Sequence, residues 1–211
     1  MPTFEEVEIL RRKYARAKKE LIESGVNYHD PAPRLNQNLI KNCRLIENRE
    51  KLLEYLPKRG VCAEIGTDKG AFANKILSIC EPKKLFLFEV DISRIKRDNV
   101  QDAIADGRCE IVEGISYENL NKFSDNFFDW VYIDGDHFYE GVRKDLEICR
   151  EKVKDDGVIV LNDYAVWSPV GMIHCGVARA VNEFCIQNGY ELLYFAFEPM
   201  MYNDVVIKKM K

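Results

Sequence analysis

The chain has 211 residues, of which 46% are hydrophobic and 31% are charged. This supplies one sizeable core and argues against a second domain. A formal net charge of −4 gives no support to a nucleic-acid partner. No apolar run approaches the roughly 18 residues of a membrane-spanning helix, and the first ten residues, MPTFEEVEIL, lack the pattern of a signal peptide. We therefore expect a cytoplasmic protein with no membrane partner.

The seven cysteines are an odd number, lie mostly within apolar stretches and form no C-x-x-C pair. They stand at positions 43, 62, 80, 109, 149, 175 and 185. This distribution indicates reduced, packed thiols and argues against disulfides or a structural zinc site.

Residues 1–57 are predicted to form an N-terminal helical arm. Apolar residues recur there at three- and four-residue spacing, which indicates an amphipathic helix over residues 4–24. These residues are Phe4, Val7, Leu10, Tyr14, Ala17 and Leu21. A Pro-Ala-Pro segment at 31–33 separates this helix from further helices that extend to residue 57.

The function of the arm has two interpretations. We expect it to be a packing or homodimer element, because its apolar stripe is larger than a free helix should expose. The alternative is a lid over a substrate, with Tyr28, His29 and Arg34 as contacts. No motif in the arm distinguishes the two.

Residues 61–72, VCAEIGTDKGAF, predict a strand, a tight turn and a helix that cradle a nucleotide-like ligand. Gly66 lets the backbone turn at the end of the strand, and Gly70 lets the helix and a ligand approach closely. The dinucleotide fingerprint G-x-G-x-x-G is absent, and Glu64 and Asp68 would repel a pyrophosphate. The acidic turn instead favours a ligand that carries positive charge.

The next predicted strand, residues 85–91, contains two acids at its end. In nucleoside-binding α/β folds, an acid about 20 residues after the glycine turn accepts hydrogen bonds from the ribose hydroxyls. Glu89 lies 19 residues after Gly70, and we prefer it for this role. Asp91 fits better as a solvated acid after a strand.

A third short strand is predicted at residues 110–112, followed by Gly114 and Ser116. Gly114 leaves room for a flat base. Ser116 is a candidate N-cap of a helix that runs to Leu120, a base contact, or both.

Two further strands end in acids. Residues 130–133 lead into Asp134, with Asp136 and His137 in the turn, and residues 158–161 lead into Asn162-Asp163-Tyr164. Because ligands bind at the carboxyl ends of strands in an open parallel sheet, several carboxylates should meet in one cleft. They are Glu64, Glu89, Asp134 and Asp163.

Carboxylates that meet in one cleft raise one another's pKa unless cations lie nearby. Asp134 and Asp163 are oxygen ligands suited to Mg²⁺, which would acidify and orient a substrate hydroxyl. His137 is the candidate general base, since its ordinary pKa is close to neutral. The structural alternative for His137 is a turn histidine that is hydrogen-bonded to the backbone. The structural alternative for Asp134 is an acid that caps the next helix.

The remainder of the chain is predicted to complete the sheet. A helix with Val177, Val181 and Phe184 on its stripe ends at Gly189, and residues 190–197 and 204–208 read as a hairpin. Between the fifth strand and this helix, residues 165–175 form a long loop. It carries Trp167, Met172 and His174, of which Trp167 is a candidate acceptor contact and His174 a second candidate base.

Two motifs give the chain a family resemblance. The pattern E-x-G-x-x-x-G at Glu64, Gly66 and Gly70 resembles motif I of the class I S-adenosylmethionine (SAM) methyltransferases. The segments Y-I-D-G-D-H-x-Y-E-G-V and N-D-Y closely resemble a small bacterial-type family of these enzymes. That family is related to the macrolide sugar O-methyltransferases and, more distantly, to catechol O-methyltransferase. The resemblance covers about residues 50–190.

The resemblance implies a Rossmann-like, doubly wound α/β domain over residues 58–211, with a seven-stranded, mostly parallel sheet and an antiparallel last strand. It also implies that SAM is the cofactor. The residues implied to bind it are Glu64, Gly66, Thr67, Gly70, Glu89, Asp91, Gly114, Ser116 and Asp134. The implied catalytic residues are His137, Asp134 and Asp163, acting on a hydroxyl of a small molecule such as a sugar or secondary metabolite.

Three alternatives remain. Tyr164 stands where catechol O-methyltransferase has an asparagine ligand, so the Mg²⁺ site at Asp134 and Asp163 competes with a scheme led by His137 alone. A nucleoside-binding module without catalysis is the second alternative, although it would not need Asp134, Asp136, His137 and Asp163. A NAD-dependent oxidoreductase is the third, and its turn chemistry does not match.

Overall fold

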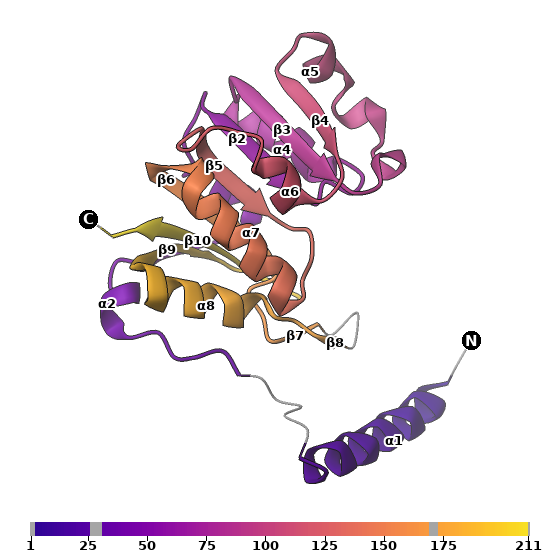
Figure 1. Cartoon of the computed structure of the whole chain (residues 1–211). Helices are drawn as coiled ribbons and strands as arrows, with labels where there is room; N and C mark the ends of the chain where they lie inside the picture. The colour runs from indigo at the N-terminus through magenta and orange to yellow at the C-terminus, as the bar shows by residue number, and fades with distance from the viewer. Residues whose placement is uncertain (1–2, 26–30, 169–172, 211) are drawn as a thin grey trace. The chain divides into compact units, whose positions relative to one another are not determined.

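The computed structural model describes residues 3–25, 31–168 and 173–210 (Figure 1). Tyr28, His29 and Met172, named above as candidate contacts or loop residues, lie outside the described residues. The chain divides into two compact units, Met1–Pro31 and Ala32–Lys211. We describe each unit by itself.

The first unit contains helix α1 (Phe4–Glu23), which confirms the predicted amphipathic helix. A capping box begins it, because the Thr3 hydroxyl accepts from the Glu6 backbone N–H and the Glu6 carboxylate accepts from the Thr3 N–H. None of its residues is buried, and Phe4 is 87% exposed. The homodimer contact expected for this stripe stays a prediction.

The second unit is built on a mixed sheet in which eight strands follow the order β1-β9-β10-β6-β5-β2-β3-β4. The strands are β1 (Arg44–Ile46), β2 (Val61–Ile65), β3 (Lys84–Glu89), β4 (Cys109–Glu113), β5 (Phe128–Ile133), β6 (Val153–Leu161), β9 (Tyr190–Ala196) and β10 (Asp204–Lys209). Strands β4, β3, β2, β5 and β6 are parallel to one another, and β10 is antiparallel to both β6 and β9. This confirms the Rossmann-like α/β fold with an antiparallel last strand.

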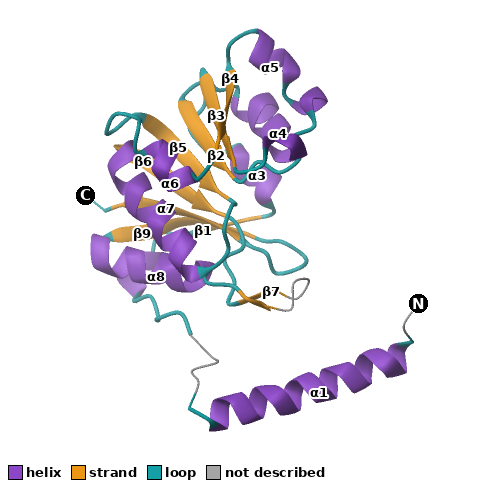
Figure 2. Cartoon of the chain, turned by 45° about the vertical axis from the view of Figure 1, so that its right-hand side comes forward, coloured by secondary structure: helices purple, strands orange, loops and turns teal. Residues whose placement is uncertain are grey.

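Helices cover both faces of this sheet (Figure 2). The main ones are α3 (Arg49–Leu53), α4 (Ala71–Cys80), α5 (Gln101–Ala105), α6 (Ser116–Leu120), α7 (Tyr139–Lys152) and α8 (Val177–Asn188), and α2 (Gln37–Ile40) is a single turn. Alternate residues of the strands face opposite layers, as the pleat requires. On β5, Val131 and Ile133 pack in the cluster with α7 and α8, whereas Trp130 and Tyr132 pack in the cluster with α3 and α4.

The sheet has one strand more than the sequence predicted, because residues 44–46 pair in parallel with β9. These residues were expected to be helical, since the apolar residues around them also fit a helical spacing. The two compact units divide after residue 31, and a domain boundary at residue 57 stays a prediction. Leu39, Leu52 and Leu53 belong to the buried core of the second unit and not to a separate arm.

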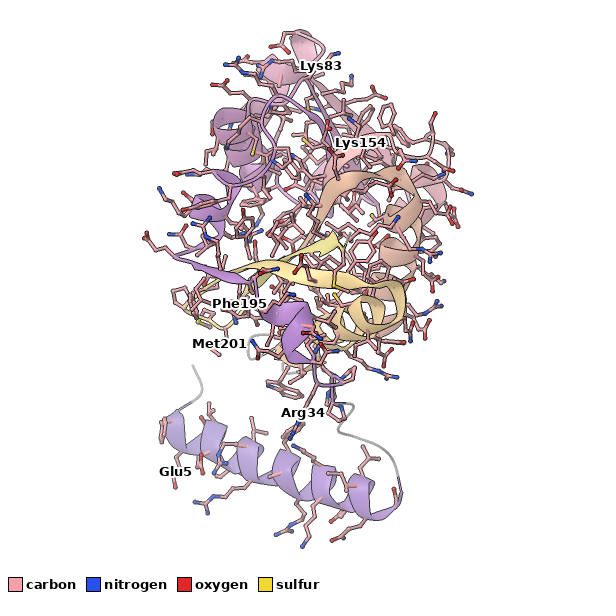
Figure 3. All side chains as sticks on the ribbon, turned by 90° about the vertical axis from the view of Figure 1, so that its left-hand side faces the viewer. Glu5, Arg34, Lys83, Lys154, Phe195 and Met201 are labelled. Atoms are coloured by element: carbon pink, nitrogen blue, oxygen red, sulfur yellow. The ribbon has the colours of Figure 1, made fainter. Side chains whose placement is uncertain are left out.

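Two smaller differences concern loops at the strand ends. The loop expected at 165–175 contains two short antiparallel strands, β7 (Trp167–Ser168) and β8 (Ile173–His174). Strand β6 begins at Val153, ahead of the strand predicted at residues 158–161. Figure 3 labels Lys83 and Lys154, which lie at the amino ends of β3 and β6. The carboxyl ends of the parallel strands lie at the opposite end of the sheet. Among the described helices, none combines the length and apolarity needed to cross a membrane.

Candidate active site

A cavity of about 670 Å³ opens at the carboxyl ends of β2, β3, β4 and β5. Six residues named from the sequence as cofactor or catalytic residues line it: Gly66, Glu89, Gly114, Ser116, Asp134 and His137. Others named there lie close by without lining the cavity: Glu64, Thr67, Gly70, Asp91 and Asp163. The parallel topology therefore brings loops from four strands to one site, as expected for this kind of sheet.

Two glycines shape the turn after β2, for different reasons. Gly66 has φ of 83°, and a Cβ there would lie 2.1 Å from the carbonyl oxygen of Asp134. Gly66 is thus required by the close approach of the β2 and β5 tips. A Cβ at Gly70 would make ordinary contacts with protein atoms at 3.6 Å, and the close approach of a ligand there stays a prediction. Gly70 is needed for its φ of 75° at the N-cap of α4.

Glu64 and Thr67 lie beneath this turn and are buried. Glu64 is 1% exposed, and within the described part of the chain its Oε2 has no hydrogen-bond partner. Burial above all, and then the nearby Asp134 carboxylate, raise the pKa of Glu64 to about 8. This carboxylate is a strong acceptor that would be stabilised by positive charge brought into the cavity.

Glu89 and Asp91 occupy different environments. Glu89 is buried, and its two carboxylate oxygens accept hydrogen bonds from the backbone N–H groups of Asp68 (2.8 Å) and Asp91 (3.2 Å). Asp91 is exposed and accepts from the backbone N–H of Ser93 at 3.1 Å, capping the 3₁₀ turn Ile92–Arg94. Of the two acids, only Glu89 lines the cavity, which favours it as the ribose acid.

An ion pair that the sequence did not reveal lies at the same end of the cavity. Arg94 Nη2 is 2.5 Å from Asp68 Oδ1, and both residues line the cavity. The two side chains are about half exposed. Their spacing of 26 residues leaves no pattern in the sequence, because it depends on how the loops after β2 and β3 meet.

The loop after β4 presents Gly114 and Ser116 to the cavity. Gly114 has φ of 111°, which a glycine adopts without strain. The expected N-cap role of Ser116 is wrong, because Ile115 occupies the N-cap of α6. The Ser116 hydroxyl instead donates to Asp145 Oδ1 of α7 at 2.6 Å.

His137 lies between two carboxylates. Its Nε2 is 3.2 Å from Asp163 Oδ2 and 3.4 Å from Asp134 Oδ1. The Asp134 carboxylate is the main cause that raises the pKa of His137, and the Asp163 charge adds to it against the effect of burial. Burial in turn raises the pKa of Asp163. The imidazole therefore contacts acidic side chains, and the backbone carbonyl oxygen of His137 accepts from the Gly176 N–H at 2.8 Å.

The turn that carries His137 depends on the glycine of its own motif. Asp136 Oδ1 accepts from the Phe138 N–H at 2.9 Å, which turns the chain into α7. A Cβ on Gly141 would lie 2.0 Å from Asp136 Oδ2. Packing therefore requires a glycine at position 141, five residues after Asp136, since any side chain there would displace the Asp136 carboxylate.

Behind Asp134 lies a buried charge network that sequence reasoning missed. Arg49 of α3 donates to Asp134 Oδ2 at 3.1 Å and also contacts the Tyr132 hydroxyl. Tyr132 in turn donates to Asp204 at 2.6 Å, and Asn162 donates to the other oxygen of Asp204 at 2.8 Å. Burial raises the pKa of Asp204 to about 6. Asp204 stands out in the sequence as an acid beside the apolar run V-V-I, whereas nothing near Arg49 marks it.

The two carboxylates proposed to hold Mg²⁺ do not fit a metal site. Asp134 and Asp163 both contact His137, and the second oxygen of Asp134 accepts from Arg49, so side chains of the protein already occupy the oxygens that a metal would need. In the described ranges, no group of three or more His, Cys, Asp or Glu side chains could hold a metal ion. Tyr164 points elsewhere, since its hydroxyl donates to Asn182 at 2.6 Å. We derive no step through a metal.

The β7–β8 pair leads into Gly176, whose N–H donates to the backbone carbonyl of His137. Trp167 and His174 stand opposite each other in the pairing, with ring centroids 5.4 Å apart in an edge-to-face arrangement. Trp167 therefore packs on this histidine. Its predicted contact with an acceptor stays a prediction, as does the role of His174 as a second base.

The fold and the cavity define the class of the protein as a Rossmann-like α/β protein with a cavity at the carboxyl ends of its parallel strands. The family model described as "Methyltransferase domain" matches residues 63–164. This stretch contains the glycine turn, Glu89, and the motifs that end in Asp134 and Asp163. A search of curated proteins found no match.

Solved structures of methyltransferases share the fold. The precorrin-6y C5,15-methyltransferase from Geobacter metallireducens is 20% identical, with 76% of this chain and 87% of that chain covered and a TM-score of 0.57. The pyocyanin biosynthetic protein PhzM is 19% identical, with 72% and 51% covered and a TM-score of 0.56. CalO1, a methyltransferase in calicheamicin biosynthesis solved with S-adenosylhomocysteine (SAH), is 17% identical, with 74% and 50% covered and a TM-score of 0.55. The present chain thus spans about half the length of PhzM and CalO1 and has a methyltransferase fold.

Proposed function

We propose that the protein is a SAM-dependent methyltransferase that transfers a methyl group to a hydroxyl of a small molecule, such as a sugar or secondary metabolite. The observation that carries this proposal is the position of His137. Its Nε2 lies within 3.4 Å of both Asp134 and Asp163, at the wall of the cavity. A module that only binds a nucleoside has no need of a base held between two acids.

The cavity suits SAM in charge and in shape. Its volume of about 670 Å³ is ample for a nucleoside with an amino-acid tail. Gly66 keeps the β2 turn close to Asp134, and the buried Glu64 is an acceptor whose ionised form the positive groups of SAM would stabilise. We assign the ribose to Glu89, and its position in the cavity wall, where it also accepts from the Asp68 N–H, supports this choice.

The chemistry then follows from the side chains around His137. SAM, when bound, supplies an electrophilic methyl group on its sulfonium. Neutral His137 accepts the proton of the acceptor hydroxyl, which makes the oxygen a better nucleophile. Asp134 and Asp163 stabilise the imidazolium that results, and Arg49 holds Asp134 in place from the opposite side. Positioning of the acceptor against the methyl group supplies the rest.

Calorimetry tests the cofactor. SAM and SAH should bind to the wild type, and Glu89→Ala should weaken binding by about 1.5–3 kcal/mol, the cost of charge-assisted hydrogen bonds. Asp91→Ala is the matched control and should leave affinity unchanged. A loss of affinity in Asp91→Ala alone would move the ribose contact there. Binding of NAD as tight as that of SAM would contradict the proposal.

Methyl transfer itself is tested with labelled SAM and metabolite extracts or a panel of sugars, phenols and alcohols. Label should appear in an acceptor with a new methyl ether. SAM binding without transfer to any acceptor would favour the nucleoside-binding module. Transfer to nitrogen or carbon would preserve the methyltransferase and overturn the choice of a hydroxyl.

A further inference from the structure

The sequence motif that carries His137 contains a tyrosine with no part in the scheme above. In Y-I-D-G-D-H-x-Y-E-G-V this residue is Tyr139, the first residue of α7, two positions after His137. His137 and Gly141 line the cavity of about 670 Å³, whereas Tyr139, also within the described chain, is not part of its wall. Its role in the motif is therefore not direct contact with a ligand in this cavity.

The side chain of Tyr139 is bound to α8. Its hydroxyl donates to Glu183 Oε2 at 2.5 Å, and Arg179 Nε donates to the other oxygen of the same carboxylate at 2.8 Å. The guanidinium carbon of Arg179 lies 4.1 Å from the centre of the Tyr139 ring, a cation–π distance. The hydrogen bond to Glu183, more than burial, raises the pKa of Tyr139 to about 12, so the hydroxyl remains a donor at neutral pH. Both contacts fix the first turn of α7 to the first two turns of α8.

The backbones of the same two helices meet beside His137. Gly176 is the N-cap of α8, and its N–H donates to the His137 carbonyl oxygen at 2.8 Å. A Cβ on Gly176 would lie 2.2 Å from the backbone nitrogen of Tyr139, so only glycine fits this contact. Helix α8 therefore contacts His137 directly, and through Tyr139 it also fixes the chain two residues further on.

The imidazole of His137 and its two carboxylates belong to different parts of the fold. Asp134 and Asp163 follow the ends of β5 and β6, whereas His137 lies in the turn that enters α7. Its Nε2 is 3.2 Å from Asp163 and 3.4 Å from Asp134, and a working site must keep such geometry to within about 0.5 Å. The carboxylates are placed by the sheet and the imidazole by the helix, so the cluster depends on how α7 is held.

We propose that Tyr139 is a positioning residue for His137, and that its hydrogen bond to Glu183 keeps the imidazole between the two carboxylates by tying α7 to α8. This gives the tyrosine of the motif a role distinct from that of the histidine. A phenylalanine at position 139 keeps the ring against Arg179 and loses only the hydrogen bond. The inference rests on the function proposed above, in which His137 is the base.

The direct test is the pKa of the His137 imidazole, measured by NMR titration. The chain has three histidines, so the spectrum of His137→Ala assigns the signal. Neither Tyr139 nor Glu183 is among the charged groups that act on this imidazole, so a change caused by substituting them reports a displacement of the ring. The charged groups that act on it are Asp134, Asp136 and Asp163.

Tyr139→Phe should lower the pKa of His137 toward the ordinary value of about 6.5, because the imidazole moves away from the carboxylates. Glu183→Ala should do the same, since it removes the acceptor of the same hydrogen bond. Glu183→Gln should keep most of the wild-type pKa, because its amide oxygen still accepts from the tyrosine. In the methyl-transfer assay, Tyr139→Phe should lower kcat by up to about 10²-fold, the cost of misplacing a catalytic group by roughly 1 Å, with KM little changed.

Controls separate a displaced base from a loss of fold. Glu140→Gln changes the exposed acid next to Tyr139, whose partner is Arg143, and should keep the wild-type pKa of His137 and the wild-type kcat. Thermal unfolding shows whether each variant is folded, and Glu183→Ala decides the question if Tyr139→Phe is not. A wild-type pKa of His137 in either folded variant would overturn the inference.

The NMR measurement needs neither SAM nor an acceptor, so it decides the positioning role by itself. Absence of methyl transfer by the wild type, with the pKa of His137 lowered in Tyr139→Phe, would count against the proposed function and leave the tie between α7 and α8 in place.

Discussion

The two halves of the cavity are built in different ways. The half assigned to the cofactor comes from residues 61–94, where glycine conformations and backbone N–H groups bonded to Glu89 set the shape. The half around His137 is held by side-chain charges from separate segments, with Arg49, Asp134, Asp163 and Asp204 brought together by the sheet. Local backbone geometry therefore shapes the first half, and long-range ion pairing shapes the second. Mutations should affect binding in one half and turnover or stability in the other.

The largest effect should come from His137→Ala. Loss of a positioned base should lower the rate of methyl transfer by about 10²–10⁴, while SAM affinity changes little because Glu89 and the glycine turn are intact. Single-turnover assays and calorimetry measure the two quantities. His174→Ala is the control and should keep the rate. Full activity in both the His137→Ala and Asp163→Asn variants would remove the base-led scheme.

Arg49→Met should destabilise the second unit strongly. It leaves the buried Asp204 and the Tyr132 hydroxyl without their cation, and breaking a buried ion pair costs about 3–5 kcal/mol. Denaturant unfolding measures this, with Arg59→Met, an exposed ion pair with Glu81, as the control. Equal stability of the two variants would show that the network around Asp134 contributes nothing.

The pH dependence of the methyl-transfer rate should show that the base is His137 and that Asp134 and Asp163 act on it. The rate should rise with pH through the pKa of His137, with a midpoint above the ordinary value of about 6.5, because Asp134 and Asp163 raise it. A raised pKa also means that the protonated form stabilises the folded state below the unfolded pKa, and that this contribution is lost as pH rises through the folded pKa. Asp134→Asn should lower the midpoint. A midpoint below 6.5 in the wild type would contradict the arrangement.

Chelation should have no effect. Because His137 and Arg49 already contact the carboxylate oxygens of Asp134 and Asp163, EDTA should leave the rate unchanged and added Mg²⁺ should not raise it. The assay is the methyl-transfer rate in metal-depleted buffer. Activity that is lost with EDTA and restored by Mg²⁺ would show that the carboxylates rearrange around an ion, as the sequence first suggested.

The smallest effect on activity is expected in the first unit. We propose that the apolar stripe of α1 mediates a homodimer, since Phe4 and Leu10 are largely exposed there. Leu10→Gln should weaken the dimer in light scattering, and Arg12→Gln, two residues away on another face, should not. A wild type that is monomeric at all concentrations would remove this proposal. Turnover should be equal in all three proteins.

The sequence by itself determined most of the sheet and the first half of the site. The strand after residue 60, the glycine turn, Glu89 and the acids that end β5 and β6 are all written in short-range patterns, since periodicity and turn chemistry act over a few residues. The family motif added the expected position of His137. These features needed no knowledge of which strands become neighbours.

Only the tertiary structure decided which charges meet. Arg49 reaches Asp134 because residues 44–46 join the sheet and carry α3 across it, and a three-residue strand has too weak a pattern to predict. The same holds for Ser116 and Asp145, which are 29 residues apart and touch through the packing of α6 on α7. Ion pairs and hydrogen bonds between distant segments leave no periodicity in the chain, because their geometry exists only once the layers have packed.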